Sequence, residues 1–223
     1  MRVLTVASRK GGSGKTTLAG HLAVEAQRNG GGLVALIDTD PQGSLAEWWN
    51  ARRTAEPVYV QTCLPSLEED LVRVRAQGVD LAVIDTPPAL SSRVSQAIRL
   101  SDLVLVPARP SPHDLRSIGG TADLVAHHGK PLAFVLNGAT KRARITAEAV
   151  DVLADYGPLA PAIVHHRVDF AASMIDGRTV MEVAGAQAAA GEVAQLWRYL
   201  QQRLQAAPAG GVWTPVTELA CGA

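Results

Sequence analysis

Short apolar runs alternate along the chain with longer stretches in which apolar residues recur every three or four positions. The apolar runs predict seven strands, at 3–7, 33–37, 58–60, 81–84, 103–106, 132–136 and 159–164. Most of these runs lack alternating polar residues, as expected of strands covered by helices on both faces. The stretches between and after them predict helices at 15–29, 44–53, 66–77, 91–100, 114–128, 146–156, 169–174 and 186–206. The pattern therefore predicts an α/β fold with a doubly wound, mostly parallel sheet.

The length and composition favour one large domain over two small ones. The chain has 223 residues, of which 47% are hydrophobic, enough to build one sizeable core. We place the domain at residues 1–206, with the last predicted helix packing one apolar face against it. Residues 207–223 contain glycine and proline and little periodicity, so we expect a loosely ordered C-terminal tail.

The overall charge and the cysteines restrict the kinds of partner and compartment. Lys+Arg and Asp+Glu both number 21, so any basic surface for nucleic acid or acidic lipid must be local. Cys63 and Cys221 match no metal-ligand spacing, which favours free thiols in a reducing compartment. The chain has no signal-peptide core and no apolar run approaching about 18 residues. We therefore expect a cytoplasmic protein.

The strongest chemical signal is a glycine-rich loop between the first predicted strand and the first predicted helix. It consists of Lys10, Gly11, Gly12, Ser13, Gly14, Lys15, Thr16 and Thr17. In this context glycines allow backbone N–H groups to surround phosphates, and the helix N-terminus adds a favourable dipole. Lys15 would neutralise phosphate charge, and the Thr16 hydroxyl would ligate Mg²⁺ directly. A chance glycine turn would not combine these residues, so the loop predicts a site for ATP and Mg²⁺.

This loop departs from the standard phosphate-binding motif at its first positions. Arg9 stands where the first glycine belongs, and an additional lysine, Lys10, opens the loop. The run KGGSGKT resembles the deviant Walker A motif of the ParA/MinD family of ATPases, and the likeness extends over residues 1–203. The resemblance implies an Mg-dependent ATP hydrolase that forms a sandwich homodimer with ATP. In that dimer Lys10 would reach the partner's nucleotide, by the logic of an arginine finger, whereas its alternative role is a solvated loop lysine.

Two predicted strands end in carboxylates at the sheet edge where ligands of open α/β sheets bind. The run DTDPQG begins at Asp38, and DTPP begins at Asp85. These runs resemble switch I and switch II of the same family. The resemblance implies that Asp38 and Asp85 bind Mg²⁺ through water and that Asp40 orients the attacking water. The alternative for Asp38 and Asp40 is to cap the following helix, since Asp is a common cap.

Asn137 follows the sixth predicted strand and matches an asparagine that contacts adenine in this family. Its amide offers both a donor and an acceptor to a base edge. An ordinary turn residue is the alternative, because Asn favours such turns.

Trp48 and Trp49 follow the switch I motif on a predicted helix. They could fill the core or form a partner surface that responds to nucleotide, and we favour the core because aromatic residues on helices usually pack inward.

The resemblance also implies a cellular task. The chain begins at its first strand without the N-terminal DNA-binding extension of larger partition proteins, and so resembles the small ParF-type ParA proteins. Such ATPases bind non-specific DNA when ATP-bound, and so associate with the nucleoid. They partition or position plasmid, chromosome or protein cargo, and a centromere-binding or cargo-adaptor protein stimulates them. The candidate DNA contacts are basic residues that could collect phosphates in a dimer: Lys141, Arg142, Arg144, Arg167 and Arg178. Nearby acids make a solvated charged face the alternative.

The sequence supports three other functions of the same fold less well than the ParA-like function. A MinD-like membrane ATPase needs a basic amphipathic C-terminal helix, and the sequence PAGGVWTPVTELACGA offers none, so we expect no membrane partner. An iron-protein reductase needs cysteines near the switch regions, and Cys63 and Cys221 lie elsewhere. An ATP-dependent ligase of the dethiobiotin or cobyrinate synthase class shares the fold but generally lacks a lysine like Lys10, and it stays open as an alternative.

Overall fold

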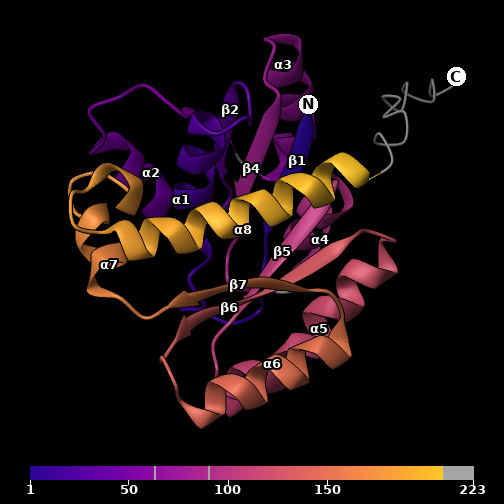
Figure 1. The fold of residues 1–223 in the computed structure, drawn as a ribbon. Helices are drawn as coiled ribbons and strands as arrows, with labels where there is room; N and C mark the ends of the chain where they lie inside the picture. The colour runs from indigo at the N-terminus through magenta and orange to yellow at the C-terminus, as the bar shows by residue number, and fades with distance from the viewer. Residues whose placement is uncertain (63, 90, 208–223) are drawn as a thin grey trace, which may run out of the picture.

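The computed structural model describes residues 1–62, 64–89 and 91–207, and within them the chain folds around one seven-stranded sheet (Figure 1). The strand order is β3-β2-β4-β1-β5-β6-β7, and every neighbouring pair is parallel. The strands are β1 (Arg2–Val6), β2 (Val34–Asp38), β3 (Val58–Gln61), β4 (Leu81–Asp85), β5 (Leu103–Ala108), β6 (Leu132–Ala139) and β7 (Leu159–His165). The predicted doubly wound parallel sheet is confirmed.

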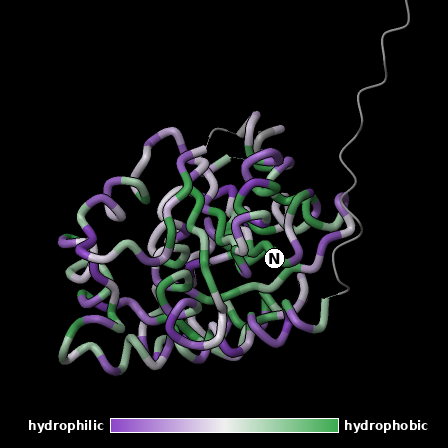
Figure 2. Tube along the Cα trace, turned by 90° about the horizontal axis from the view of Figure 1, so that it is seen from above, coloured by the Kyte–Doolittle hydropathy of each residue, from purple (hydrophilic) through white to green (hydrophobic). Residues whose placement is uncertain are grey.

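Helices cover both faces of this sheet. They are α1 (Lys15–Arg28), α2 (Ser44–Asn50), α3 (Leu67–Ala76), α4 (Ser92–Arg99), α5 (Pro112–His127), α6 (Arg144–Tyr156), α7 (Val168–Met174) and α8 (Gln187–Ala206), with 3-10 turns η1 (Leu64–Ser66) and η2 (Val180–Glu182). One apolar cluster packs α1, α2, α7 and α8 against one face of the sheet. Two other clusters pack α3, α4, α5 and α6 against the opposite face. In Figure 2 apolar segments lie mainly inside and polar segments mainly outside.

All seven strands and eight helices lie within a few residues of their predicted ranges. The 3-10 turns were not predicted, and α5 begins two residues before the predicted start. Ser111 caps this helix, since its hydroxyl accepts the Asp114 N–H at 3.1 Å, and Pro112 suits the first helical turn. The predicted core face of α8 is confirmed, with Trp197 donating its indole N–H to the Asn29 carbonyl. Cys63, Cys221 and residues 208–223 of the predicted tail lie outside the described residues.

A buried histidine joins the helix of the glycine loop to η2. His21 has no exposed surface, and its Nδ1 lies 2.8 Å from the Thr17 carbonyl oxygen. The backbone N–H of Val180 donates to His21 Nε2 at 3.2 Å. Nε2 must therefore be an acceptor while Nδ1–H donates, which requires the neutral ring. Burial lowers the pKa of His21 to about 4, consistent with that assignment.

This histidine predicts a loss of stability in mild acid. Its pKa is about 4 in the folded chain and about 6.5 when unfolded, so the unfolded chain takes up a proton first as the pH falls. The contribution of neutral His21 to the free energy of unfolding is complete above pH 6.5 and is lost as the pH falls toward 4. Because of this group, the free energy of unfolding measured in urea should be about 2–3 kcal/mol lower at pH 4.5 than at pH 7.5. His21→Gln should flatten the pH slope by that amount, and equal slopes in the two proteins would contradict the assignment.

Candidate nucleotide-binding site

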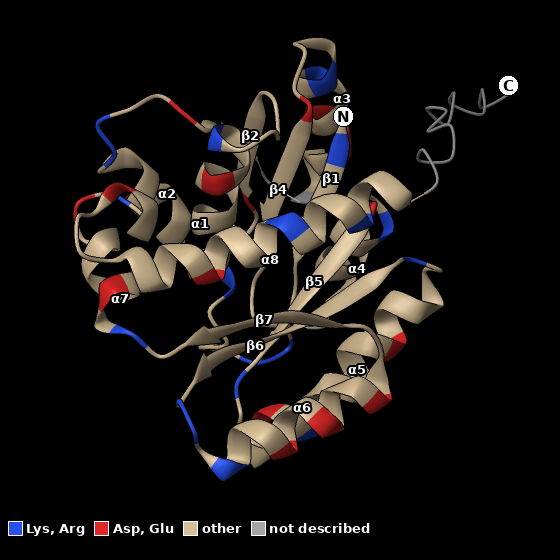
Figure 3. Cartoon of the chain, viewed as in Figure 1, with Lys and Arg blue, Asp and Glu red and all other residues tan. Residues whose placement is uncertain are grey.

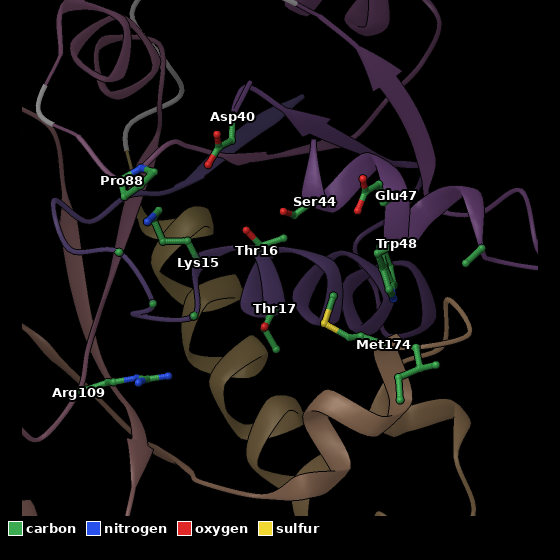
Figure 4. Close-up of a pocket in the computed structure, with 15 residues that line it drawn as sticks. Lys15, Thr16, Thr17, Asp40, Ser44, Glu47, Trp48, Pro88, Arg109 and Met174 are labelled. Atoms are coloured by element: carbon green, nitrogen blue, oxygen red, sulfur yellow. The ribbon is translucent and has the colours of Figure 1, made fainter. Parts of the chain in front are cut away.

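A cavity of about 630 Å³ opens at the C-terminal edge of the sheet (Figure 4). One wall is the glycine loop, from which Gly11, Gly12, Gly14, Lys15, Thr16 and Thr17 line the cavity. The loop connects β1 to α1, so the N-terminus of α1 opens toward this space. Backbone N–H groups at a helix N-terminus have no partner within the helix and favour anions. The cavity therefore has the size and the donors for a nucleotide.

Gly14 fulfils two conditions that only glycine meets. Its φ of 92° lies in the left-handed region, where it forms the N-cap of α1. A Cβ at this position would lie 2.2 Å from Asn137 Nδ2, well inside contact distance. That Nδ2 donates to the Ser13 carbonyl at 2.7 Å, so β6 holds the loop in shape. Asn137 Oδ1 is left as an acceptor suited to an exocyclic amino group, and the predicted adenine contact stays a prediction.

Lys15 is the buried cation of the cavity. Its Nζ donates to the Lys10 carbonyl at 3.3 Å, across the inside of the loop. Burial lowers the pKa of Lys15, while the nearby carboxylates of Asp85 and Asp40 raise it. Lys10 contributes its backbone here, but the residue itself is exposed and does not line the cavity. The two lysines of the motif therefore occupy different environments.

Thr16 and Asp85 meet beside Lys15. The Thr16 hydroxyl donates to Asp85 Oδ2 at 2.6 Å, and the Thr86 N–H donates to Asp85 Oδ1 at 3.0 Å. Burial raises the pKa of Asp85 to about 7, with smaller opposing effects from Thr16 and Lys15. A hydroxyl and a carboxylate side by side are the hard oxygen donors that Mg²⁺ prefers. The described residues contain no group of three or more His, Cys, Asp or Glu able to hold a metal.

The two acids of the switch I motif have different surroundings. Asp38 Oδ1 accepts the Asp40 N–H at 2.9 Å, and Oδ2 accepts the N–H groups of Leu45 and Ala46 at 3.2 Å. Asp38 thus caps α2, whose own N-cap is Gly43. Asp40 lines the cavity, and within the described chain its carboxylate accepts only the Gln42 N–H, at 3.0 Å. The capping alternative therefore fits Asp38, while its role toward Mg²⁺ and the water-orienting role of Asp40 stay predictions.

Several cavity residues were not predicted as part of the site. They come from α2 and its C-terminal end, from the segments that follow β4 and β5, and from the end of α7: Ser44, Glu47, Trp48, Ala51, Pro88, Arg109, Met174 and Ile175. Trp48 is buried, as we expected, and its ring packs against Gly20 of α1. Arg109 directly follows β5, at the edge of the sheet where ligands bind, so its position after a predicted strand could have identified it. Met174 and Ile175 reach the cavity only through the tertiary fold.

The five candidate DNA contacts fall into two groups. Three of them are paired with acids, Arg144 with Glu148 at 2.7 Å, Arg167 with Glu192 at 2.6 Å and Arg178 with Asp176 at 2.8 Å. The other two, Lys141 and Arg142, are exposed in the connection from β6 to α6 and form no ion pair within the described chain. Figure 3 shows basic segments at the start of α6 and before α7, near acidic ones. Among the five candidates, the positive charges without an ion pair in the described chain therefore lie in the β6–α6 connection.

The fold and the cavity together define a P-loop nucleotide-binding protein. The family model for the CobQ/CobB/MinD/ParA nucleotide binding domain matches residues 4–180, and the chain belongs to this family of P-loop ATPases. The maintenance of carboxysome distribution protein A of Halothiobacillus neapolitanus is 28% identical over 203 residues, covering 86% of this chain and 93% of that protein. The resemblance found in the sequence is confirmed.

Two solved structures share the fold. The cell division ATPase MinD of Pyrococcus furiosus has a TM-score of 0.74 at 18% identity, covering 90% of this chain and 98% of that one. Cobyrinic acid a,c-diamide synthase of Mycobacterium smegmatis, solved with an ATP analogue and magnesium, has a TM-score of 0.72 at 18% identity, covering 93% and 97%. Members of the family thus bind ATP-type nucleotides with magnesium. Among the helices of the described residues, none combines the length and the apolar composition of a membrane span.

Proposed function

We propose that this protein is a ParA-like ATPase that forms a sandwich dimer with Mg-ATP and positions DNA or protein cargo. The observation that supports this best is the environment of Lys10. It opens a complete phosphate loop, yet it is exposed and lies outside the lining of its own cavity. A lysine so placed is available to the nucleotide of a second subunit, where it would stabilise charge in the transition state.

Within one subunit the residues divide the work of ATP hydrolysis. The loop N–H groups and Lys15 bind and neutralise the phosphates. Thr16 directly, and Asp85 and Asp38 through water, would hold Mg²⁺, which supplies positive charge to the phosphate oxygens when bound. Asp40 orients the water that attacks the terminal phosphate. Asn137 accepts a hydrogen bond from the adenine amino group.

The names of the relatives support the proposed kinds of cargo. The Halothiobacillus protein is named for the distribution of carboxysomes, which supports a large protein cargo as well as plasmid or chromosomal DNA. We propose that the ATP-bound dimer binds non-specific DNA and so associates with the nucleoid. A centromere-binding or cargo-adaptor protein would then stimulate hydrolysis and release the dimer.

The second candidate function is an ATP-dependent small-molecule ligase, favoured by the likeness to cobyrinic acid a,c-diamide synthase. A ligase has no need of an exposed lysine at position 10 or of a dimer that depends on ATP. Light scattering of the purified chain with ATP and with ADP therefore separates the two functions. A monomer in both states would favour the ligase.

Binding to DNA should depend on both ATP and salt. We expect the protein to bind random-sequence duplex with Mg-ATP, and weakly or not at all with ADP, because dimerisation joins two patches that are weak alone. If the dimer contacts about four phosphates, affinity should fall about 100-fold between 50 and 200 mM salt. Fluorescence anisotropy with a labelled duplex would measure this. Lys10→Ala should lose the binding by removing the contact between subunits.

A matched pair of charge reversals locates the DNA surface. Lys141→Glu alters the unpaired basic connection, whereas Arg198→Glu makes the same change of charge at an exposed position of α8, outside the candidate set. Only Lys141→Glu should weaken DNA binding, with ATP affinity measured in parallel. Equal losses would indicate an effect of net charge alone, and no binding at low salt would end the DNA hypothesis.

A further inference from the structure

Helix α2, which follows switch I, is joined to the segment between α7 and η2 by a compact set of contacts. Trp48 donates its indole N–H to the Arg178 carbonyl at 3.1 Å. Arg52, just beyond α2, donates to the Gly177 carbonyl at 2.7 Å and to both Glu182 carboxylate oxygens at 2.8 and 3.1 Å. We call these five residues, Trp48, Arg52, Gly177, Arg178 and Glu182, the clasp. They connect positions about 130 residues apart in the chain.

The clasp is closely packed. The Arg52 side chain is only 3% exposed, and its guanidinium lies 5.0 Å from the centre of the Trp48 ring. Gly177 has a φ of 76°, and a Cβ there would lie 2.3 Å from the Arg52 backbone nitrogen. A forked ion pair with little exposure has one favoured geometry, and losing one partner leaves a buried charge. A displacement of α2 would therefore move Gly177 and Arg178 with it.

The other side of the clasp faces the nucleotide cavity. Trp48 lines the cavity, as do its neighbour Glu47 on α2 and, from α7 and its end, Met174 and Ile175. Figure 4 shows Trp48 and Met174 at the same end of the cavity. Ile175 is 82% exposed, so it has free surface toward any ligand that fills this end. Trp48 thus has the cavity on one side and the Arg178 backbone on the other.

We propose that Trp48 is a positioning residue through which an occupied nucleotide site orders the segment 175–182 and, with it, Arg178. A ligand shifts such an equilibrium only if it contacts the two states differently. The Trp48 ring lines the cavity and its N–H bonds the segment 175–182, so a ligand in the cavity can contact the ordered and the displaced states of the segment differently. The consequence for DNA rests on the proposed function, in which Arg178 is a candidate contact. The ordering of the segment itself does not.

The next residue provides a matched control. Trp49 lies on the same helix and also donates its indole N–H to a backbone carbonyl, that of Pro57, at 2.9 Å. Its ring stacks on Tyr59 at 5.3 Å, and it does not line the cavity. Replacing either tryptophan by phenylalanine removes one N–H donor and retains an aromatic ring. Only the change at Trp48 should affect the response of segment 175–182 to nucleotide.

Hydrogen exchange of the full-length chain tests this inference. Backbone amides of residues 175–182 are compared without nucleotide and with saturating Mg-ATP, with saturation checked by calorimetry. We expect exchange to slow at least about fivefold with ATP in the wild type and in Trp49→Phe, the lower end of typical coupling between sites. In Trp48→Phe the slowing should be less than about twofold. Equal slowing in both variants, or none in the wild type, would overturn the role of Trp48.

A second pair of variants serves if Trp48→Phe does not fold. Arg52→Lys keeps the charge but loses the fork that holds Gly177 and Glu182, while Arg53→Lys makes the same change at an exposed neighbour. Arg52→Lys should lose the ATP-dependent slowing and Arg53→Lys should keep it. If slowing occurs in a wild-type protein that binds no DNA, the proposed function fails and the inference stands. If DNA binding depends on ATP without any slowing, the inference fails alone.

Discussion

Replacing Lys15 with alanine is expected to abolish Mg-ATP binding, with affinity falling at least about 100-fold and out of the range of calorimetry. Lys15 is the buried cation of the cavity, with its Nζ held across the inside of the glycine loop. Charge-assisted hydrogen bonds to phosphate are among the strongest in proteins, and each makes a net contribution of about 1.5–3 kcal/mol. An ammonium group that donates to two phosphate oxygens would therefore contribute about 3–6 kcal/mol, and its loss would exceed about a 100-fold effect on affinity.

The control for this experiment is another lysine. Lys141 is exposed and does not line the cavity, so Lys141→Ala should leave ATP affinity unchanged. The thermal midpoint of Lys15→Ala should not fall, because burial already disfavours the charged form of this side chain. A folded Lys15→Ala protein with wild-type affinity for ATP would refute the assignment of the loop as the phosphate site.

Asp40→Ala should leave ATP binding intact and slow hydrolysis by about 10²–10⁴-fold. Asp40 faces the cavity, and within the described chain its carboxylate accepts only the neighbouring Gln42 N–H. A residue that orients water without holding the phosphates contributes to the transition state more than to binding. Phosphate release under single-turnover conditions would measure the loss. Size-exclusion chromatography with ATP should show a persistent dimer, because the variant does not consume the nucleotide that joins the subunits.

Asp38→Ala is the matched comparison, since it removes a carboxylate two residues away with a different environment. Three backbone N–H groups would lose their acceptor, and the start of α2 would lose its cap. Its free energy of unfolding should fall by about 1–3 kcal/mol, whereas that of Asp40→Ala should change little. If Asp40→Ala were destabilised to the same extent and monomeric with ATP, Asp40 would be a structural residue like Asp38.

The sheet and the phosphate loop could be predicted because their signals are local. Most of the strands are nearly continuous apolar runs, the pattern expected of parallel strands covered by helices on both faces. The glycine loop, Asp40 and Asp85 lie at or shortly after the C-terminal ends of strands, and parallel strands bring these ends to one edge. The predicted phosphate site therefore rests on three short segments. The fold places the loop and Asp40 around one cavity, and Asp85 accepts a hydrogen bond from Thr16 of the loop.

The remaining contacts join residues that have no local pattern in common. His21 accepts a hydrogen bond from Val180, and Arg52 pairs with Glu182, across 159 and 130 positions of the chain. The basic candidates illustrate the same limit from the other direction. The sequence places Arg167 with Arg178 among the candidate DNA contacts, and the structure pairs Arg167 with Glu192 of a helix that begins 20 residues later. The sequence shows where basic residues cluster, whereas the acids that neutralise them can come from distant positions that only the fold brings close.

The missing side chain of Gly14 has a consequence for how base preference could change in this protein. The Asn137 amide occupies the space that a Cβ at Gly14 would need, and it also holds the Ser13 carbonyl. A substitution at Asn137 would therefore alter the contour of the glycine loop together with the amide that we propose to contact the base. Variants at this position that accept a different nucleotide should also show altered affinity for inorganic triphosphate, which has no base at all.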